Sequence, residues 1–187
     1  MDKHQSESLA QGLLSGEISI EQFVNRVTSP QTESLKQAHL DLDRIERCGL
    51  AEVIFGEGKS IDALKSIATA LQKHGQGVLI TRISPEQAEP LMRVFPEADY
   101  QPLARTFCVG TTSEGRVPAW SALGRVCVVS AGTSDLPVAE EARVTASWIG
   151  VTVETVYDVG VAGPQRLTEK LDTLRHADAV VVVAGME

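Results

Sequence analysis

The hydrophobic residues of the second half of the chain follow strand and helix patterns in turn. Residues 126–129 form a continuous apolar run, which is typical of a strand buried on both faces. The run breaks at Gly132, and apolar residues then recur at helical spacing from Val138 to Ile149. This pattern predicts a strand, a short turn and a helix. Free backbone N–H groups at such a helix N-terminus can bind an anion, although the same pattern also describes a plain capped turn.

The turn itself contains residues suited to a helix start. Ser134 or Asp135 can cap the helix, and Pro137 suits its first turn. Beyond this helix, the pattern predicts a strand at 151–157, a helix with Leu167, Leu171 and Leu174, and a buried strand at 179–184. Repeated strand–helix–strand units predict a parallel sheet with right-handed crossovers.

The first half of the chain has shorter and more polar patterns. Residues 6–27 predict a helical pair that is broken at Gly16, with a capping box formed by Ser19 and Gln22. The polar residues 28–38 are interpreted as a linker.

A small α/β unit is predicted next, with a last strand at 103–109 that carries Arg105. Its other expected elements are strands at 52–55 and 78–81 and helices at 60–74 and 84–94. The resulting division is an N-terminal helical segment and linker at 1–38, a small α/β domain at 39–122, and an incomplete parallel-sheet domain at 123–187. The predicted fold class is α/β.

Composition narrows the classes of partner. The 187 residues carry a net charge of −8 and no basic patch, which argues against nucleic-acid binding. An anionic ligand therefore needs local Arg or Lys side chains. We expect no membrane span, since no apolar run approaches about 18 residues. The N-terminus lacks a signal-peptide pattern, and three widely spaced cysteines indicate neither a disulfide framework nor a zinc site, so the cytoplasm is expected.

Three predicted turns lie where a ligand is expected. Residues 132–135, 158–163 and 185–187 each follow a parallel strand, and ligands of open α/β sheets bind beyond the carboxyl ends of the strands. In the first half, residues 56–60 combine two glycines with Lys59, which could neutralise a phosphate, although the spacing of a P-loop is absent.

These motifs resemble a known family. Residues 131–138 are similar to the Gly-Ser-x-Ser-Asp loop of phosphoribosylaminoimidazole carboxylases of the PurE class, and the wider pattern is closer to the LarB family. The resemblance rests on residues 41–44, 52–59, 81–82, 132–141, 157–163 and 184–187. It implies a three-layer, PurE-like parallel sheet of the flavodoxin or Rossmann kind, preceded by a small α/β domain and N-terminal helices.

The resemblance also implies an activity. LarB proteins carboxylate the pyridinium ring of nicotinic acid adenine dinucleotide with CO2 or bicarbonate, and they hydrolyse its phosphoanhydride. The products are pyridinium-3,5-biscarboxylic acid mononucleotide and AMP, in the first step of nickel-pincer nucleotide synthesis. The family's nucleophilic cysteine belongs to a part that follows the Ala-Gly-Met-Glu block. Cys48, Cys108 and Cys127 do not match it, so we expect a truncated chain that is inactive alone.

Site roles follow from the resemblance and from charge. Asp135 and Glu187 are the expected catalytic residues. Glu187 resembles the residue that helps position CO2 or substrate, and a carboxylate there could also take the ring proton. Asp135 belongs to the loop that resembles the family's ligand loop and could orient a ribose hydroxyl or a substrate proton. Gly132, Thr133 and Ser134 resemble the first ligand loop; Asp158, Gly160 and Gly163 resemble the second. Lys59, Arg82 and Arg105 are candidates for anion contacts. Each also has a structural interpretation, as a cap, a glycine turn, a frayed terminus or a surface charge.

Other functions stay open. The main alternative is a noncatalytic nucleotide- or phosphate-binding module on a PurE-like fold, since fold alone does not fix function. A purine-pathway carboxylase is the weaker third option, because that family has Ser-Ala-His where this chain has Tyr157-Asp158-Val159. The resemblance implies homo-oligomers. No resident cofactor or metal ligand set is predicted, although Mg²⁺ beside a pyrophosphate would be compatible chemistry.

Overall fold

The computed structural model describes residues 3–28, 32–35, 38–41, 44, 50–110 and 124–185. The chain forms two compact units, residues 1–43 and residues 44–187.

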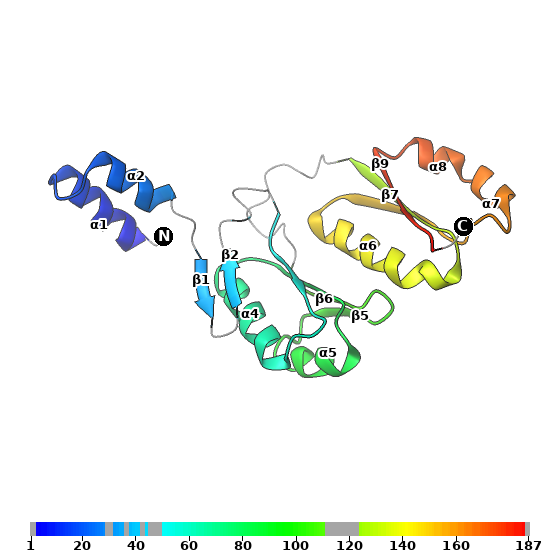
Figure 1. Ribbon diagram of the computed structural model, residues 1–187, viewed down its shortest axis with the longest axis horizontal. Helices are drawn as coiled ribbons and strands as arrows, with labels where there is room; N and C mark the ends of the chain where they lie inside the picture. Colours follow the sequence, from blue (N-terminus) through cyan, green and yellow to red (C-terminus); the bar gives the residue numbers. More distant parts are fainter. Residues whose placement is uncertain are drawn as a thin grey trace. The chain divides into compact units, whose positions relative to one another are not determined.

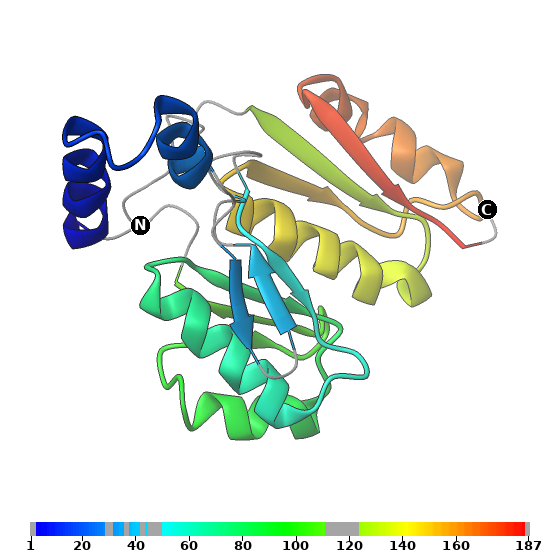
Figure 2. The ribbon, with the colours of Figure 1, turned by 60° about the vertical axis from the view of Figure 1, so that its left-hand side comes forward.

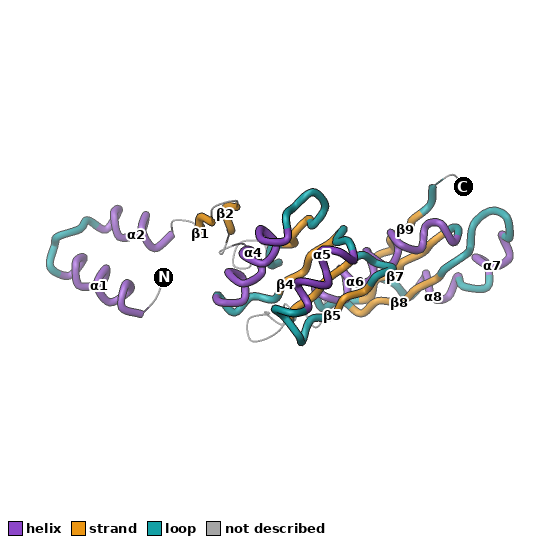
Figure 3. The backbone as a smooth tube through the Cα atoms, turned by 90° about the horizontal axis from the view of Figure 1, so that it is seen from below, coloured by secondary structure: helices purple, strands orange, loops and turns teal. Residues whose placement is uncertain are grey.

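The first unit begins with the predicted helical pair. Helix α1 spans Lys3–Leu14 and helix α2 spans Ile20–Thr28 (Figure 3). Gly16 has a φ of 75°, a left-handed conformation that favours glycine and ends the first helix. The predicted capping box is confirmed: the Ser19 backbone N–H donates to Gln22 Oε1 at 2.9 Å, and the Gln22 N–H donates to Ser19 Oγ at 3.1 Å.

A β-hairpin follows where the sequence indicated a linker. Strands β1 (Thr32–Leu35) and β2 (Ala38–Asp41) pair antiparallel, with Leu35 opposite Ala38. The linker prediction for residues 28–38 is therefore wrong over β1. The polar composition of this segment gave no strand signal. A two-stranded ribbon pairs through backbone hydrogen bonds, and polar side chains do not prevent them.

The second unit starts with a four-stranded sheet in the order β3-β4-β6-β5. Its strands are β3 (Val53–Phe55), β4 (Val78–Thr81), β5 (Asp99–Gln101) and β6 (Thr106–Val109). Only β3 and β4 are parallel, while β6 runs antiparallel to both β4 and β5. The sequence did not predict β5. Arg105 was expected on a strand, but it lies in the turn that precedes β6, because β5 and β6 form a hairpin around residues 102–105.

Two helices cover one face of this sheet. They are α4 (Ile61–Lys73) and α5 (Pro85–Met92), both near their predicted positions. Ser60 Oγ accepts the Ala63 N–H at 3.2 Å, and Ser84 and Gln87 form a capping box. Phe107 of β6 is fully buried and packs edge-to-face on Phe95, which follows α5.

The predicted parallel sheet is present in the second half. Strands β7 (Arg125–Ser130), β8 (Thr152–Val156) and β9 (Ala179–Val183) pair in the order β8-β7-β9, with both pairs parallel. Helix α6 (Leu136–Ile149) covers one face, and α7 (Pro164–Thr168) and α8 (Leu171–Arg175) lie on the other (Figures 1 and 2). The sheet therefore has the expected three layers.

Side chains on β7 pack against both helical layers. Cys127 and Val129 are buried with Val156, and Leu174 of α8 packs against them. Val128, which points to the opposite face, is also fully buried. The single helix expected around Leu167, Leu171 and Leu174 is instead two five-residue helices, and Lys170 lies between them with a φ of −107° outside the helical region.

Strand β9 differs from its sequence pattern. The continuous valines predicted a buried strand, but Val180, Val181 and Val182 are 45%, 39% and 67% exposed. Among the described residues β9 pairs only with β7, so it forms an edge of the sheet and its outer surface stays uncovered.

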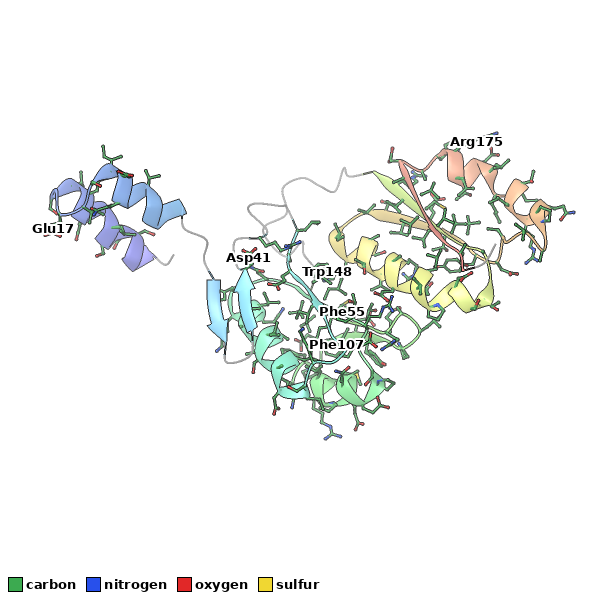
Figure 4. All side chains as sticks on the ribbon, viewed as in Figure 1. Glu17, Asp41, Phe55, Phe107, Trp148 and Arg175 are labelled. Carbon is green, nitrogen blue, oxygen red and sulfur yellow. The ribbon has the colours of Figure 1, made fainter. Side chains whose placement is uncertain are left out.

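Helix α6 also packs on the first sheet. Trp148, near the end of α6, lies at the side that faces this sheet and is buried with Ala51 and Leu79 (Figure 4). Cys108 of β6, which pairs with Leu79 in the sheet, packs against the same group. One helix therefore contributes to the cores of both sheets. None of the described helices combines the length and apolar character that a membrane crossing requires.

Burial of Cys108 predicts a pH-dependent stability. Burial, with a smaller effect of Asp99, raises the pKa of the Cys108 thiol to about 11. The folded protein thus favours the neutral thiol, and this contribution is complete below the unfolded pKa of about 8.5. It is lost as pH rises from there toward about 11. We expect urea unfolding of the wild type to lose more free energy between pH 8 and pH 10.5 than unfolding of Cys108→Ala. Equal losses in both proteins would contradict the assignment.

Candidate functional site

The three predicted turns of the parallel sheet come together at the carboxyl ends of its strands. The Gly160 N–H donates to the Ala131 carbonyl at 2.9 Å, and the Val159 N–H donates to the Ser130 carbonyl at 3.2 Å. On the other side, the Ala131 N–H donates to the Val183 carbonyl at 3.0 Å. These bonds attach the loops after β8 and β9 to the loop after β7.

Close contact of these loops requires glycine at position 160. A Cβ atom at Gly160 would lie 2.9 Å from the Ala131 carbonyl oxygen, which is closer than real Cβ contacts allow. The loop after β9 also approaches the first loop, because a Cβ atom at Gly185 would lie 3.6 Å from Asp135 Oδ1.

The first loop is stabilised by its own aspartate. Residues Thr133–Asp135 form a 3₁₀ turn, and α6 begins at Leu136, with Pro137 in its first turn as predicted. Asp135 Oδ2 accepts the Gly132 N–H at 2.8 Å, so its carboxylate closes the loop. The expected capping role differs, because the Asp135 side chain makes no capping bond to α6. Thr133 and Ser134 are exposed in this turn.

The second loop is built around Asp158, which has a φ of 58°. Such a left-handed conformation is uncommon for a residue other than glycine, and it clusters at functional sites. Arg166 of α7 donates to the Asp158 carbonyl at 2.8 Å and pairs with its carboxylate. Gly163 makes room for this arginine, since a Cβ atom there would lie 2.5 Å from Arg166 Nε. Sequence reasoning missed Arg166, although its position three residues after Gly163 was a usable signal.

Tyr157 joins the second loop to α6. Its hydroxyl donates to Glu140 Oε1 at 2.7 Å. Burial, followed by this hydrogen bond and the charge of Glu140, raises the pKa of Tyr157, so the phenol remains protonated at neutral pH. Glu140 was not singled out from the sequence, where it is one of many surface charges.

Two of the three predicted cations meet at one end of the first sheet. Arg82 and Arg105 have φ values of 53° and 52°. Arg105 Nη2 donates to the Arg82 carbonyl at 3.3 Å, and the Ile83 N–H donates to the Arg105 carbonyl at 3.0 Å. Arg82 Nε lies 2.5 Å from Glu141 Oε2, an ion pair that reaches α6.

Lys59 lies in the loop after β3. The Gly56 N–H donates to the Thr81 carbonyl at 2.7 Å, and Gln87 Nε2 donates to the carbonyls of Gly56 and Lys59 at 3.1 and 2.8 Å. The backbone of this loop is therefore fixed near the carboxyl end of β4, where Arg82 follows. The Lys59 side chain is exposed.

A shallow cavity of about 340 Å³ lies along α6. It is lined by Val138, Glu141, Ala142, Thr145, Ala146 and Ile149. Glu141, which pairs with Arg82, lines this cavity, and the other lining residues are mainly apolar.

The predicted site residues thus fall into two groups. The loops of the parallel sheet hold Gly132, Thr133, Ser134, Asp135, Asp158, Gly160 and Gly163, and the first sheet holds Lys59, Arg82 and Arg105. Helix α6 contacts both groups through Glu140 and Glu141. Glu187 lies outside the described residues. No group of three or more His, Cys, Asp or Glu side chains suited to a metal ion occurs in the described part of the chain.

Comparison with known proteins identifies the family. Residues 32–111 match the family model for the LarB/PurE-like N-terminal domain. The chain is also similar to an uncharacterized protein of Methanocaldococcus jannaschii, at 33% identity over 177 residues. That alignment covers 92% of this chain and 69% of the relative. The protein belongs to the LarB family.

Proposed function

We propose that the protein acts in the carboxylation of the pyridinium ring of nicotinic acid adenine dinucleotide with CO2 or bicarbonate. Hydrolysis of the phosphoanhydride would then release AMP and pyridinium-3,5-biscarboxylic acid mononucleotide, the first step of nickel-pincer nucleotide synthesis. The family is carboxylase-related. The observation that carries the proposal is the convergence of three loops at the carboxyl ends of a parallel sheet, with the Asp135 carboxylate in the first loop and near Gly185 of the loop after β9.

The two sets of site residues suit different parts of the dinucleotide, its phosphates and its nucleotide portion. Arg82, Arg105 and Lys59 would bind the phosphates, because the chain's net charge of −8 requires local cations. The loop of Gly132, Thr133 and Ser134 and the loop of Asp158, Gly160 and Gly163 would hold the nucleotide. Thr133 and Ser134 are exposed at the surface of the first loop.

Asp135 has the central chemical role in this proposal. Its Oδ2 closes the loop, while Oδ1 faces the loop after β9, where a substrate carboxyl or ring proton could be oriented. Glu187 would act beside it. We further propose Mg²⁺ only as a companion of the pyrophosphate, and homo-oligomeric assembly in the cytoplasm.

A second candidate function is nucleotide binding without turnover by this chain. Cys108 and Cys127, the cysteines in the described residues, both lie in strands, and burial raises the pKa of each thiol. Neither is suited to act as the nucleophile that the family's reaction needs. Binding of the dinucleotide without carboxylation would favour this candidate.

Asp135→Asn tests the chemistry separately from the fold. Asn keeps a carbonyl oxygen that can accept the Gly132 N–H, so we expect an unchanged melting temperature. The variant loses the carboxylate, so where the wild type turns over nicotinic acid adenine dinucleotide with bicarbonate, we expect that turnover to be lost. Asp172→Asn is the matched control, because Asp172 is exposed on α8. Full turnover in Asp135→Asn would remove Asp135 from the chemistry.

The arginines are tested by affinity. Replacing Arg82 or Arg105 with Ala should weaken binding of nicotinic acid adenine dinucleotide by roughly 1–3 kcal/mol, since charge-assisted hydrogen bonds to phosphate would be lost. Isothermal calorimetry measures the change. Arg93→Ala serves as control, because Arg93 is exposed and pairs only with Glu89 among the described residues. Unchanged affinity in both site variants would exclude these residues from the ligand site.

Gly160→Ala tests the contact between the first two loops. The new Cβ must push the Asp158 loop away from Ala131, so we expect weaker dinucleotide binding together with a lower melting temperature. Gly12→Ala is the control, because the nearest atoms to a Cβ there belong to Ile18 at 3.6 Å, an ordinary contact. A Gly160→Ala protein that binds like the wild type would show that ligand binding does not depend on the closeness of these loops.

A further inference from the structure

Three charged side chains on the second turn of α6 all contact other elements. Glu140, Glu141 and Arg143 are only 16%, 20% and 30% exposed. Charged residues on a covered helix face are uncommon unless each is paired, because removal from water is costly. These three side chains therefore differ from the solvated charges of an ordinary helix surface.

Glu140 uses both of its carboxylate oxygens. Oε1 accepts a hydrogen bond from the Tyr157 hydroxyl at 2.7 Å, and Oε2 accepts one from Arg143 Nε at 2.9 Å and forms an ion pair with Arg143 Nη2 at 2.8 Å. Tyr157 directly precedes Asp158, whose left-handed backbone shapes the second loop. One end of the network is therefore attached to the parallel-sheet site.

The other end reaches the first sheet. Arg143 Nη2 donates to Gln101 Oε1 at 3.2 Å. Gln101 is the last residue of β5 and stands at the base of the turn that holds Arg105. Arg105 in turn donates to the Arg82 carbonyl, and Arg82 returns to α6 through Glu141. Together with the chain between Gln101 and Arg105, these contacts join the arginine pair and the Asp158 loop in one network that passes through α6.

We propose that Glu140 is a positioning residue, which fixes the arginine pair of the first sheet relative to the Asp158 loop. This inference rests on the proposed function, in which one dinucleotide contacts both groups. Glu140 need not touch the ligand. It acts through Tyr157 on one side, and through Arg143 and Gln101 on the other.

Backbone conformation supports this role. Arg82, Arg105 and Asp158 all have positive φ, and such residues persist only where their surroundings hold them in place. The network contacts Arg82 and Arg105 directly, and it contacts Asp158 through the preceding residue, Tyr157. Glutamate is specifically suited, because both partners of Glu140 are donors. Glutamine would present an NH2 group to one of them.

Hydrogen exchange tests this network of contacts without any ligand. We compare residues 156–163 and 99–106 in the wild type, Glu140→Gln, Tyr157→Phe and Arg143→Met. Glu140→Gln should speed exchange in both segments, Tyr157→Phe mainly in 156–163, and Arg143→Met mainly in 99–106. Glu89→Gln is the matched control, since it removes an exposed ion pair on α5. Thermal melts verify that each variant is folded at the temperature used.

A change confined to α6, or to one of the two segments, in Glu140→Gln would overturn the proposal. Non-additive effects in the Tyr157→Phe and Arg143→Met double variant would support it, because both contacts pass through the same carboxylate.

Ligand binding adds a readout that a purely structural role would not change. A ligand that contacts both groups depends on the distance between the arginine pair and the Asp158 loop. Glu140→Gln should therefore weaken the binding of nicotinic acid adenine dinucleotide by roughly tenfold or more. Inorganic pyrophosphate, which would contact only the arginine group, and nicotinic acid riboside, which would contact only the loops, should change much less. Equal losses for all three ligands would contradict positioning. If the wild type binds no dinucleotide, the proposed function fails, and the exchange pattern alone then decides the role of Glu140.

Discussion

Parallel pairing of β7 with β8 and β9 is the constraint on which the candidate site depends. Because all three strands run in the same direction, their carboxyl ends lie at one edge, with Ser130 beside Val183 and Val129 beside Val156. Each following loop must therefore turn within reach of the other two. The hydrogen bonds from Gly160 to Ala131 and from Ala131 to Val183 are consequences of that alignment. Glycine at position 160 is needed because two backbones approach closely at this edge.

Helix α6 connects this edge of the parallel sheet to the first sheet. Its C-terminal Trp148 contributes to the core against the first sheet, while its first turns follow directly from the Asp135 loop. The apolar contact holds the first sheet beside the helix but is not directional. The contacts of Glu140 and Glu141 restrict how α6 is oriented, because hydrogen-bond and ion-pair geometry permits fewer arrangements than apolar packing does.

The sequence predicted those parts of the fold whose information is local. Periodicity and caps located α4, α6 and β7, since apolar spacing and Ser60 or Pro137 act within a few residues. It failed for β1 and β5, which are short and polar and gain their stability from partners elsewhere in the chain. The direction of β6 was also beyond local reading, because an apolar strand packs equally well in a parallel or an antiparallel sheet. The valines of β9 likewise indicate an apolar strand without showing which residues cover it.

The loops of the candidate site were predictable in part for the same reason. Glycine and aspartate in turns after strands are local signals, and they located the loops of Gly132, Asp135, Asp158 and Gly160. Arg166, Glu140 and Glu141 were missed, because a charge on a helix is usually solvated and only tertiary proximity gives it another role. Their pairing changes the electrostatics of the site: Arg82 is compensated by Glu141 and Arg166 by Asp158, whereas Arg105 donates to a neutral carbonyl and forms no ion pair within the described residues. In a chain with net charge −8, Arg105 therefore keeps the most uncompensated positive charge of these three arginines, and a phosphate that approaches Arg82 must compete with Glu141.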